Sequence, residues 1–238
     1  MTKPRPAGHL LIDCLLAQGV DTAFGVPGES YLPVIDALYD ARNRLRLIVS
    51  RHEGGAAFMA EAYGKLTGQP GICFVTRGPG ATNAAIGVHT ARQNSTPLIL
   101  FVGQVGRHMR EREAFQEIDY RAFFGSLAKW VTEIDDAARI PEIVARAFAT
   151  ALSGRPGPVV VALPEDMLRE MTSATAVPAT AHFEAEPSAG ALRAAIALLK
   201  RAQRPLVIVG GGGWTSEGRR ALDAFAAANR LPVAVAFR

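Results

Sequence analysis

The stretch GICFVTRGPGATNAAIGVHTARQNSTPLILFVG, residues 71–103, decides the fold of this chain. Residues 72–76 are an apolar run that predicts a strand, and the glycine turn at 78–80 leads into helical spacing that lasts to about residue 93. A second apolar run at 97–103 predicts the next strand. A strand, a helix and a strand joined by short turns are typical of a β-α-β unit, in which the two strands are parallel.

The same rhythm continues on both sides of this stretch. We expect helices at residues 7–18, 30–39, 54–67 and 138–152, and strands at 22–24, 45–49, 130–134 and 159–163. Ser30 is expected to cap its helix, and the strand at 45–49 is expected to be buried. Residues 104–124 have weak periodicity and are too long for an ordinary connection, which is typical of functional or mobile loops. The pattern predicts an α/β fold with a doubly wound parallel sheet and helices on both faces.

A change of composition divides the chain. Residues 171–188 are rich in Ala, Thr and Pro and lack apolar periodicity, so we interpret them as a linker between a first domain at 1–170 and a second at 189–238. The second domain is expected to contain helices at 189–202 and 216–229 and strands at 205–209 and 232–236. One β-α-β unit cannot cover both faces of its sheet, so this second α/β domain is expected to be incomplete and truncated.

Composition excludes several classes of protein. Hydrophobic residues make up 49% of the chain, and 26 basic against 22 acidic residues leave a net charge of +4. The basic cluster at 107–112 is interleaved with Glu111 and Glu113, so no nucleic-acid partner is expected. Cys14 and Cys73 lie on apolar segments without metal-ligand spacing, which favours core residues of a reduced, cytoplasmic protein. No signal peptide and no membrane span are expected.

Three turns between a strand and a helix are candidates for a ligand site: GVPGES at 25–30, RHEGGAA at 51–57 and TRGPGATN at 76–83. Glycines let the backbone approach a ligand, and the helix that follows offers free N–H groups. Glu53 follows a strand at the position where α/β folds place ligand chemistry, although an acid that complements a helix dipole would occupy the same position.

Purely structural interpretations of the other turns stay open. Taken alone, the turn at 25–30 is interpreted as a tight βα connection with a capping serine, and His52 is interpreted as a packing residue. The turn at 76–83 lacks the lysine of a phosphate loop. The four glycines at 210–213 fail the dinucleotide spacing and either cradle a ligand or form a permissive turn.

The ordered set of motifs is more specific than any one of them. FGVPGE, RHEGGAAFMAEAYGKLTG, TRGPGATNA, TPLILFVGQV, AFQE, GRPGPVVVALPEDM and PLVIVGGGG occur in this order. This set resembles the acetolactate-synthase-like branch of thiamine-diphosphate enzymes across essentially the whole chain. The resemblance implies that residues 1–170 bind the aminopyrimidine ring of thiamine diphosphate and that 189–238 begin a central domain. It also implies a homodimer or homotetramer with its sites between subunits.

The resemblance assigns a role to individual residues. Glu53 would be the catalytic group, because the glutamate of this motif hydrogen-bonds N1′ of the aminopyrimidine and so promotes loss of the C2 proton. Gln116 would reach toward the reacting centre and Phe115 would lie near the substrate. Arg155 would contact FAD in members that bind it, whereas a plain surface arginine is the alternative. The remaining residues that the family places around the cofactor rings are Pro27, Gly28, Thr76, Pro79 and Asn83.

The family's diphosphate and magnesium motif begins with Gly-Asp-Gly, and these 238 residues contain no such sequence. No metal ligand is therefore assigned to this chain, magnesium would be bound by the missing C-terminal domain, and the chain is expected to be inactive alone. The motifs imply a carboligase or decarboxylase acting on a 2-oxo acid.

Two departures bear on the reaction. Glu165, in LPED, replaces the lysine usual in acetolactate synthases, and Glu29 stands where a small residue is common. Acetolactate synthesis specifically is thus not implied. The alternatives are a subunit of a split decarboxylase, which the start of a central domain disfavours, and a non-catalytic ligand-binding module, which the retention of Glu53 disfavours.

Overall fold

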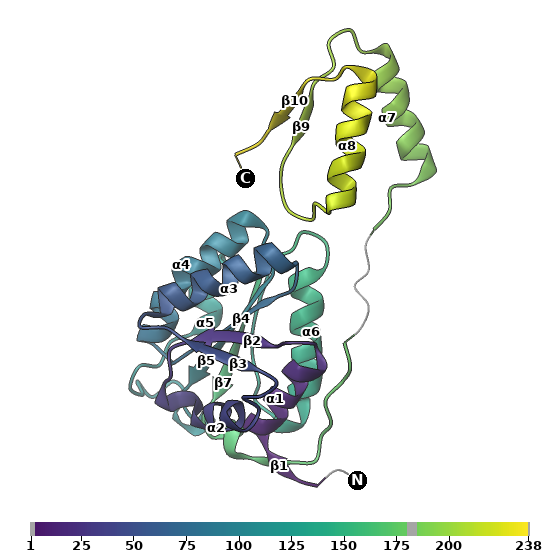
Figure 1. Ribbon diagram of the computed structural model, residues 1–238. Coiled ribbons are helices and arrows are strands. Elements are labelled where there is room, and N and C mark those ends of the chain that lie inside the picture. Colours follow the sequence, from purple (N-terminus) through teal and green to yellow (C-terminus); the bar gives the residue numbers. More distant parts are fainter. Residues whose placement is uncertain (1–2, 180–184, 238) are drawn as a thin grey trace. The chain divides into compact units, whose positions relative to one another are not determined.

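The chain forms two compact units, Met1–His182 and Phe183–Arg238 (Figure 1). The computed structural model describes residues 3–179 and 185–237. Of the segment expected to be a linker, residues 180–184 lie outside the described residues.

The first unit is built on one six-stranded sheet in which every neighbouring pair of strands is parallel. Its strands are β2 (Thr22–Gly25), β3 (Arg46–Val49), β4 (Gly71–Val75), β5 (Leu98–Gln104), β6 (Trp130–Glu133) and β7 (Pro158–Pro164). They lie in the order β3-β2-β4-β5-β7-β6. The helices between them are α1 (Ala7–Ala17), α2 (Leu32–Asp40), α3 (Glu53–Thr67), α4 (Pro79–Asn94), α5 (Tyr120–Phe124) and α6 (Ile140–Leu152). The doubly wound fold predicted from the sequence is confirmed.

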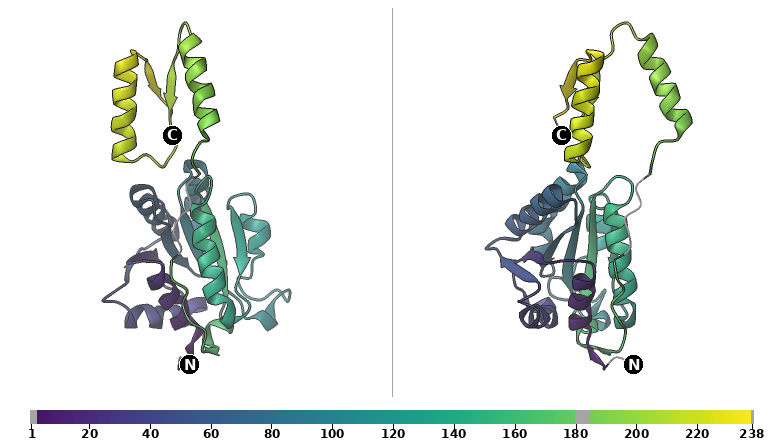
Figure 2. Two further views of the ribbon diagram at one scale, coloured as in Figure 1. Left: turned by 90° about the vertical axis from the view of Figure 1, so that its right-hand side faces the viewer. Right: turned by 45° about the vertical axis from the view of Figure 1, so that its right-hand side comes forward.

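Helices cover both faces of this sheet, as Figure 1 and the right-hand view of Figure 2 show. Successive residues of the central strands point to opposite faces. Ile72 and Phe74 of β4 therefore pack with α1, α2 and α6, whereas Cys73 and Val75 pack with α3, α4 and α5. Both cores are apolar, which explains why the central strands are continuous hydrophobic runs rather than alternating ones.

Both cysteines lie in these cores as free thiols. Burial raises the pKa of Cys14 to about 12 and also raises the pKa of Cys73. The prediction that they are small core residues is confirmed.

Two local predictions were wrong. The strand predicted as buried, β3, is an edge strand that pairs only with β2 among the described strands, and its Arg46 and Val49 are exposed. Ser30 does not cap α2, because it lies in a 3-10 turn, η1 (Glu29–Tyr31), before the helix begins at Leu32. Its hydroxyl is directed instead to Thr76, at an O–O distance of 2.8 Å.

The weakly periodic stretch at 104–124 is ordered by short elements. It contains a 3-10 turn, η2 (Arg107–Met109), and ends in α5. Asp119 caps α5, since its Oδ1 accepts hydrogen bonds from the N–H groups of Arg121 and Ala122 at 2.9 and 3.1 Å.

The sequence analysis missed a pair of two-residue strands, β1 (Arg5–Pro6) and β8 (Met171–Thr172), which pair antiparallel. Strand β8 lies in the segment expected to be a linker. Beyond it, Ala174 and Ala176 pack against the core, and Gln18 donates a side-chain hydrogen bond to the carbonyl of Val177 at 3.0 Å. Residues 171–179 therefore lie along the first unit.

The second unit consists of α7 (Ala189–Arg201), β9 (Val207–Val209), α8 (Ser216–Asn229) and β10 (Val233–Val235), with β9 and β10 parallel. Within residues 185–237, Ala226 is the one buried hydrophobic residue. The described part of this α/β unit thus leaves both its helices and its sheet without a closed core. In the part of the chain that the structure describes, no helix is long and apolar enough to cross a membrane.

Candidate functional site

The strand order creates a topological switch point at the carboxyl edge of the sheet. From β2 the chain goes outward to the edge strand β3, and it returns to β4 on the other side of β2. Such a switch point, where connections leave neighbouring strands in opposite directions, is where open α/β sheets bind ligands. The turns after β2, β3 and β4 carry the three glycine-containing motifs singled out in the sequence, so the fold gathers all three at one edge.

Glu53 is the first residue of α3, and Asn83 lies in the first turn of α4. The side-chain amide of Asn83 donates a hydrogen bond to Oε2 of Glu53 at 2.9 Å. His52 is the N-cap residue of α3, because its ring Nδ1 accepts a hydrogen bond from the N–H of Gly54 at 3.0 Å. This contact fixes the helix start and with it the position of the half-buried Glu53 carboxylate.

The second carboxylate oxygen of Glu53 is accessible. Among the described residues, no donor contacts Oε1, and a Cβ added to Gly80 would lie 3.6 Å from this atom and 3.0 Å from Cγ2 of Thr76. A side chain at position 80 would therefore crowd this flank of the carboxylate. Glu53 thus has one carboxylate oxygen held by an amide and one left open. Such a group is able to hold a proton on a bound heterocycle.

The turn after β2 lies directly on Thr76. A Cβ at Gly28 would come within 2.5 Å of Cβ of Thr76, so only glycine permits this approach. The buried Ser30 hydroxyl joins the same turn to the next, because it contacts the Thr76 hydroxyl and accepts a hydrogen bond from the N–H of Arg77 at 3.3 Å. Pro27 is exposed at this turn. The sequence indicated Gly28 and Thr76 but not the bridging role of Ser30.

The turn before α4 is held from the segment 104–124. Gly78 has a φ of 57°, and a Cβ there would lie 2.7 Å from Cβ of Gln116. The N–H of Gly78 donates a hydrogen bond to the hydroxyl of Tyr120 at 3.2 Å, and that hydroxyl donates to the carbonyl of Gly103 at 3.0 Å. Burial raises the pKa of Tyr120 to about 12, so the hydroxyl keeps the proton that it donates.

These contacts bring the backbone of Gln116 next to the N-terminus of α4, where Pro79 is the first residue. Phe115 is 74% exposed beside it. The sequence signal for Tyr120 was absent, because a tyrosine after a weakly periodic stretch has no motif of its own.

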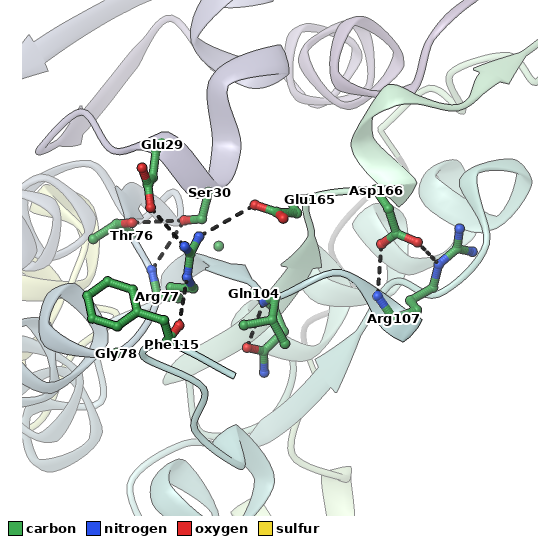
Figure 3. A network of polar contacts seen from close by, with 12 residues as sticks. Glu29, Ser30, Thr76, Arg77, Gly78, Gln104, Arg107, Phe115, Glu165 and Asp166 are labelled. Carbon is green, nitrogen blue, oxygen red and sulfur yellow. Dashed lines mark hydrogen bonds and ion pairs between the residues drawn. The ribbon is translucent and has the colours of Figure 1, made fainter. Parts of the chain in front are cut away.

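The two glutamates that depart from the usual motifs both contact Arg77, as Figure 3 shows. The N–O distances are 2.8 Å to Glu29 and 3.5 Å to Glu165, and the Arg77 side chain is only 10% exposed. The Arg77 Nε also donates a hydrogen bond to the carbonyl of Phe115 at 3.2 Å. Sequence reasoning missed this cluster, because its members follow different strands.

Arg155 lies elsewhere. Its Nε donates to the Ser95 hydroxyl at 2.7 Å and its Nη2 to the Gln93 carbonyl at 3.2 Å, both at the carboxyl end of α4. Pro79 and Asn83 are at the opposite end of this helix. The structure therefore does not bring Arg155 together with Glu53, and a contact of Arg155 with FAD stays a prediction.

A parallel sheet that gathers a glutamate, an amide and two glycine turns at its switch point defines an α/β cofactor-binding domain. Comparison with known proteins identifies the cofactor class. Residues 5–123 match the family described as "Thiamine pyrophosphate enzyme, N-terminal TPP binding domain", and residues 192–238 match its central domain. The chain belongs to the thiamine pyrophosphate enzyme family.

Curated relatives point to one branch of this family. The chain is 40% identical over 225 residues to an acetolactate synthase of Bacillus subtilis, and 39% identical over 231 residues to an acetolactate synthase large subunit of Parasynechococcus marenigrum. It is 38% identical over 224 residues to the acetolactate synthase isozyme 2 large subunit of Escherichia coli. These matches cover 93–94% of this chain but only 37–40% of the relatives. The chain thus spans about two fifths of their length and corresponds to their N-terminal portion.

Proposed function

We propose that the first unit supplies the aminopyrimidine-binding half of a thiamine-diphosphate site, in an enzyme that acts on 2-oxo acids. One observation carries the proposal: at the switch point Glu53 has Oε2 held by Asn83 at 2.9 Å, while the flank of Oε1 is kept clear by Gly80. Matches to the family and to acetolactate synthases support the choice of cofactor.

The residues present fit the aminopyrimidine ring. When bound, thiamine diphosphate supplies a C2 carbanion and an electron sink for the carbons of the substrate. Glu53 would hold a proton at N1′ of the ring, and Asn83 keeps its carboxylate oriented. Gly28 and Thr76 would line the ring with the turns after β2 and β4, and Pro79 would flank it at the start of α4.

We further propose that the site is completed by a second subunit. Large apolar side chains on the elements that follow β2 and flank the switch point are exposed among the described residues: Val49 at the end of β3, Phe58 on α3 and Ile86 on α4 are 60%, 41% and 56% exposed. A homodimer or homotetramer would bury them, and the second subunit would supply the ligands for magnesium and the diphosphate that complete the site. The free thiols of Cys14 and Cys73 favour a reducing, cytoplasmic setting.

The reaction would be decarboxylation or carboligation of a 2-oxo acid. The names of the relatives favour carboligation. Phe115 and Gln116 would face the substrate, since the contact with Gly78 brings their segment to the start of α4. Glu29 stands where a small residue is common in acetolactate synthases, and Glu165 stands where a lysine is usual, which leaves the acceptor open.

The test measures by NMR how fast the C2 proton of thiamine diphosphate exchanges for deuterium. The sample is the protein joined to the domain that completes its site, with magnesium present. We expect Glu53→Gln to slow exchange by at least about 100-fold, because an amide cannot share the proton of N1′. Glu142→Gln, on the surface of α6, is the matched control and should leave the rate unchanged. Equal rates for Glu53→Gln and the unsubstituted protein would refute the assignment and favour a non-catalytic binding module.

A further inference from the structure

Arg77 contacts three separate segments of the chain through three different nitrogens (Figure 3). Its Nη2 reaches Glu29 in η1, its Nη1 reaches Glu165 after β7, and its Nε reaches the carbonyl of Phe115. The two glutamates are 48 and 88 residues away in the sequence. A guanidinium is planar and has directed donors, so contacts with three segments fix its own orientation and theirs.

The charges of the cluster explain why the Arg77 side chain can be nearly buried. Removing an unpaired arginine from water is costly, but two carboxylates at 2.8 and 3.5 Å compensate its charge. The carboxylates themselves are well hydrated, with side chains 69% and 40% exposed for Glu29 and Glu165. Each of the three guanidinium nitrogens has a protein partner, so these contacts use three of the five N–H donors of Arg77.

The segment that Arg77 contacts is conformationally unfavourable by itself. Gln116 has a φ of 65°, and Glu111 and Glu113 have φ values of 59° and 54°. Residues other than glycine adopt this region at a cost and keep it only where the surroundings hold them there. Around Gln116 the surroundings are the backbone of Gly78 on one side and the Arg77 hydrogen bond to the preceding carbonyl on the other.

We propose that Arg77, clamped by Glu29 and Glu165, is a positioning residue that holds the Phe115–Gln116 segment against the turn before α4. This inference rests on the proposed function for the role of Gln116, but not for the contact itself. The clamp sets the segment in place before any ligand binds. Glu29 and Glu165 act through Arg77, because both carboxylates pair with its guanidinium.

The clamp is tested by hydrogen exchange of the 238-residue chain without cofactor, read by mass spectrometry for peptides within residues 110–118. This segment contains protected amides, since the N–H of Glu117 donates to the carbonyl of Ala114 at 3.0 Å and that of Glu111 to the Glu117 side chain at 2.9 Å. We expect Arg77→Met to raise their exchange rate about tenfold or more, because opening no longer breaks a charge-assisted hydrogen bond. Amides of β4 and β5 should keep their protection.

Two further variants separate positioning from general stabilisation. Arg77→Lys keeps the charge, but one ammonium cannot reach all three oxygens. We therefore expect it to raise the exchange rate at 110–118, but by less than Arg77→Met does. Glu29→Gln combined with Glu165→Gln should approach the effect of Arg77→Met. Arg139→Met is the matched control, because Arg139 pairs with Glu142 at 3.0 Å on the surface and does not contact the segment in the described structure.

Unchanged exchange at 110–118 in Arg77→Met would overturn the proposal, and so would an equal rise across β4 and β5. An exchange rate at 110–118 that is the same in Arg77→Lys as in the unsubstituted protein would overturn the role of the directed donors. If Arg77→Met does not fold, the double glutamine variant decides: a local rise supports the clamp and its absence refutes it. Because no cofactor is present, this result is independent of C2 exchange, and either proposal can fail while the other stands.

Discussion

At the scale of single residues, Glu53 occupies a position that suits a structural role, and its proposed catalytic role stays a prediction. As the first residue of α3 it places a negative charge at a helix N-terminus, which is stabilising. Its carboxylate also meets Asn83 at the switch point. The structural role and the proposed catalytic role therefore use the same position, and only chemical measurements on Glu53→Gln separate them.

Asp166 stabilises the start of the segment 104–124. Its two oxygens accept hydrogen bonds from the backbone N–H and the Nε of Arg107 at 3.0 and 2.9 Å (Figure 3). Burial tends to raise the pKa of Asp166, but the hydrogen bonds from Arg107 outweigh it and lower the pKa below its ordinary value. The charged form is thus favoured in the folded protein.

The pH dependence of stability follows from this direction. A carboxyl group with a lowered pKa in the folded state contributes stability above its unfolded pKa of about 3.9, and this contribution is lost as the pH falls through the folded pKa. We expect Asp166→Asn to lower the free energy of unfolding by about 1–2 kcal/mol at neutral pH, and by less below about pH 4. Urea denaturation at both pH values measures it. A penalty that grows on acidification would contradict the argument.

At the scale of elements, α3 and α4 approach each other closely enough to bring Glu53 to Asn83. Small residues make this possible: a Cβ at Gly87 of α4 would lie 2.4 Å from Cβ of Ala57 on α3. Neither helix has a strongly amphipathic sequence, because one side is alanine and glycine rather than large apolar residues. The position of the candidate site is thus coupled to this helix contact.

Gly87→Ala tests the coupling. The added methyl group forces the helices apart, and we expect a loss of about 1–2 kcal/mol in the free energy of unfolding after the gain in helix propensity is subtracted. Gly55→Ala on α3 is the control, because the one atom near its added Cβ is the Ser50 hydroxyl at 3.2 Å, the end of a side chain rather than the backbone of another helix. It should be neutral or stabilising by up to about 1 kcal/mol. Urea denaturation compares the two, and a Gly87→Ala variant as stable as the control would disprove close packing.

At the scale of the whole molecule, the first unit is closed by a segment that follows its sheet. Strand β8 pairs with β1, and Ala174 and Ala176 pack on the core beside α1. The amide of Ala179 also donates a hydrogen bond to the carbonyl of Ala17 at 3.2 Å. Residues 171–179 therefore contribute to the stability of the first unit.

Two truncated chains test this contribution. We expect residues 1–182 to fold with a thermal midpoint within about 2 °C of that of the first unit in the full chain, because its core is complete. We expect residues 1–170 to melt lower by roughly 5–10 °C, as the loss of a strand pair and two partly buried alanines costs about 2–3 kcal/mol. Circular dichroism during heating measures both midpoints. Equal midpoints would show that 171–182 add nothing.

Local signals predicted most of the first unit. Apolar runs and glycine turns gave the order of strands and helices because each signal lies within a few neighbouring residues. They failed for Ser30, whose hydroxyl contacts Thr76, a residue 46 positions away, instead of the backbone of the helix that follows it. They also failed for β3, since an apolar run does not reveal whether its strand is central or at an edge.

The sequence by itself determined the fold class, the family and the placement of Glu53 at the end of a strand, because these depend on short motifs and their order. Only the tertiary structure decided that Glu29 and Glu165 share Arg77, and that Tyr120 joins the turn at Gly78 to β5. These contacts join residues 17 to 88 positions apart. Their partners become neighbours only when the strands assemble into one sheet, so no local pattern in the sequence carries them.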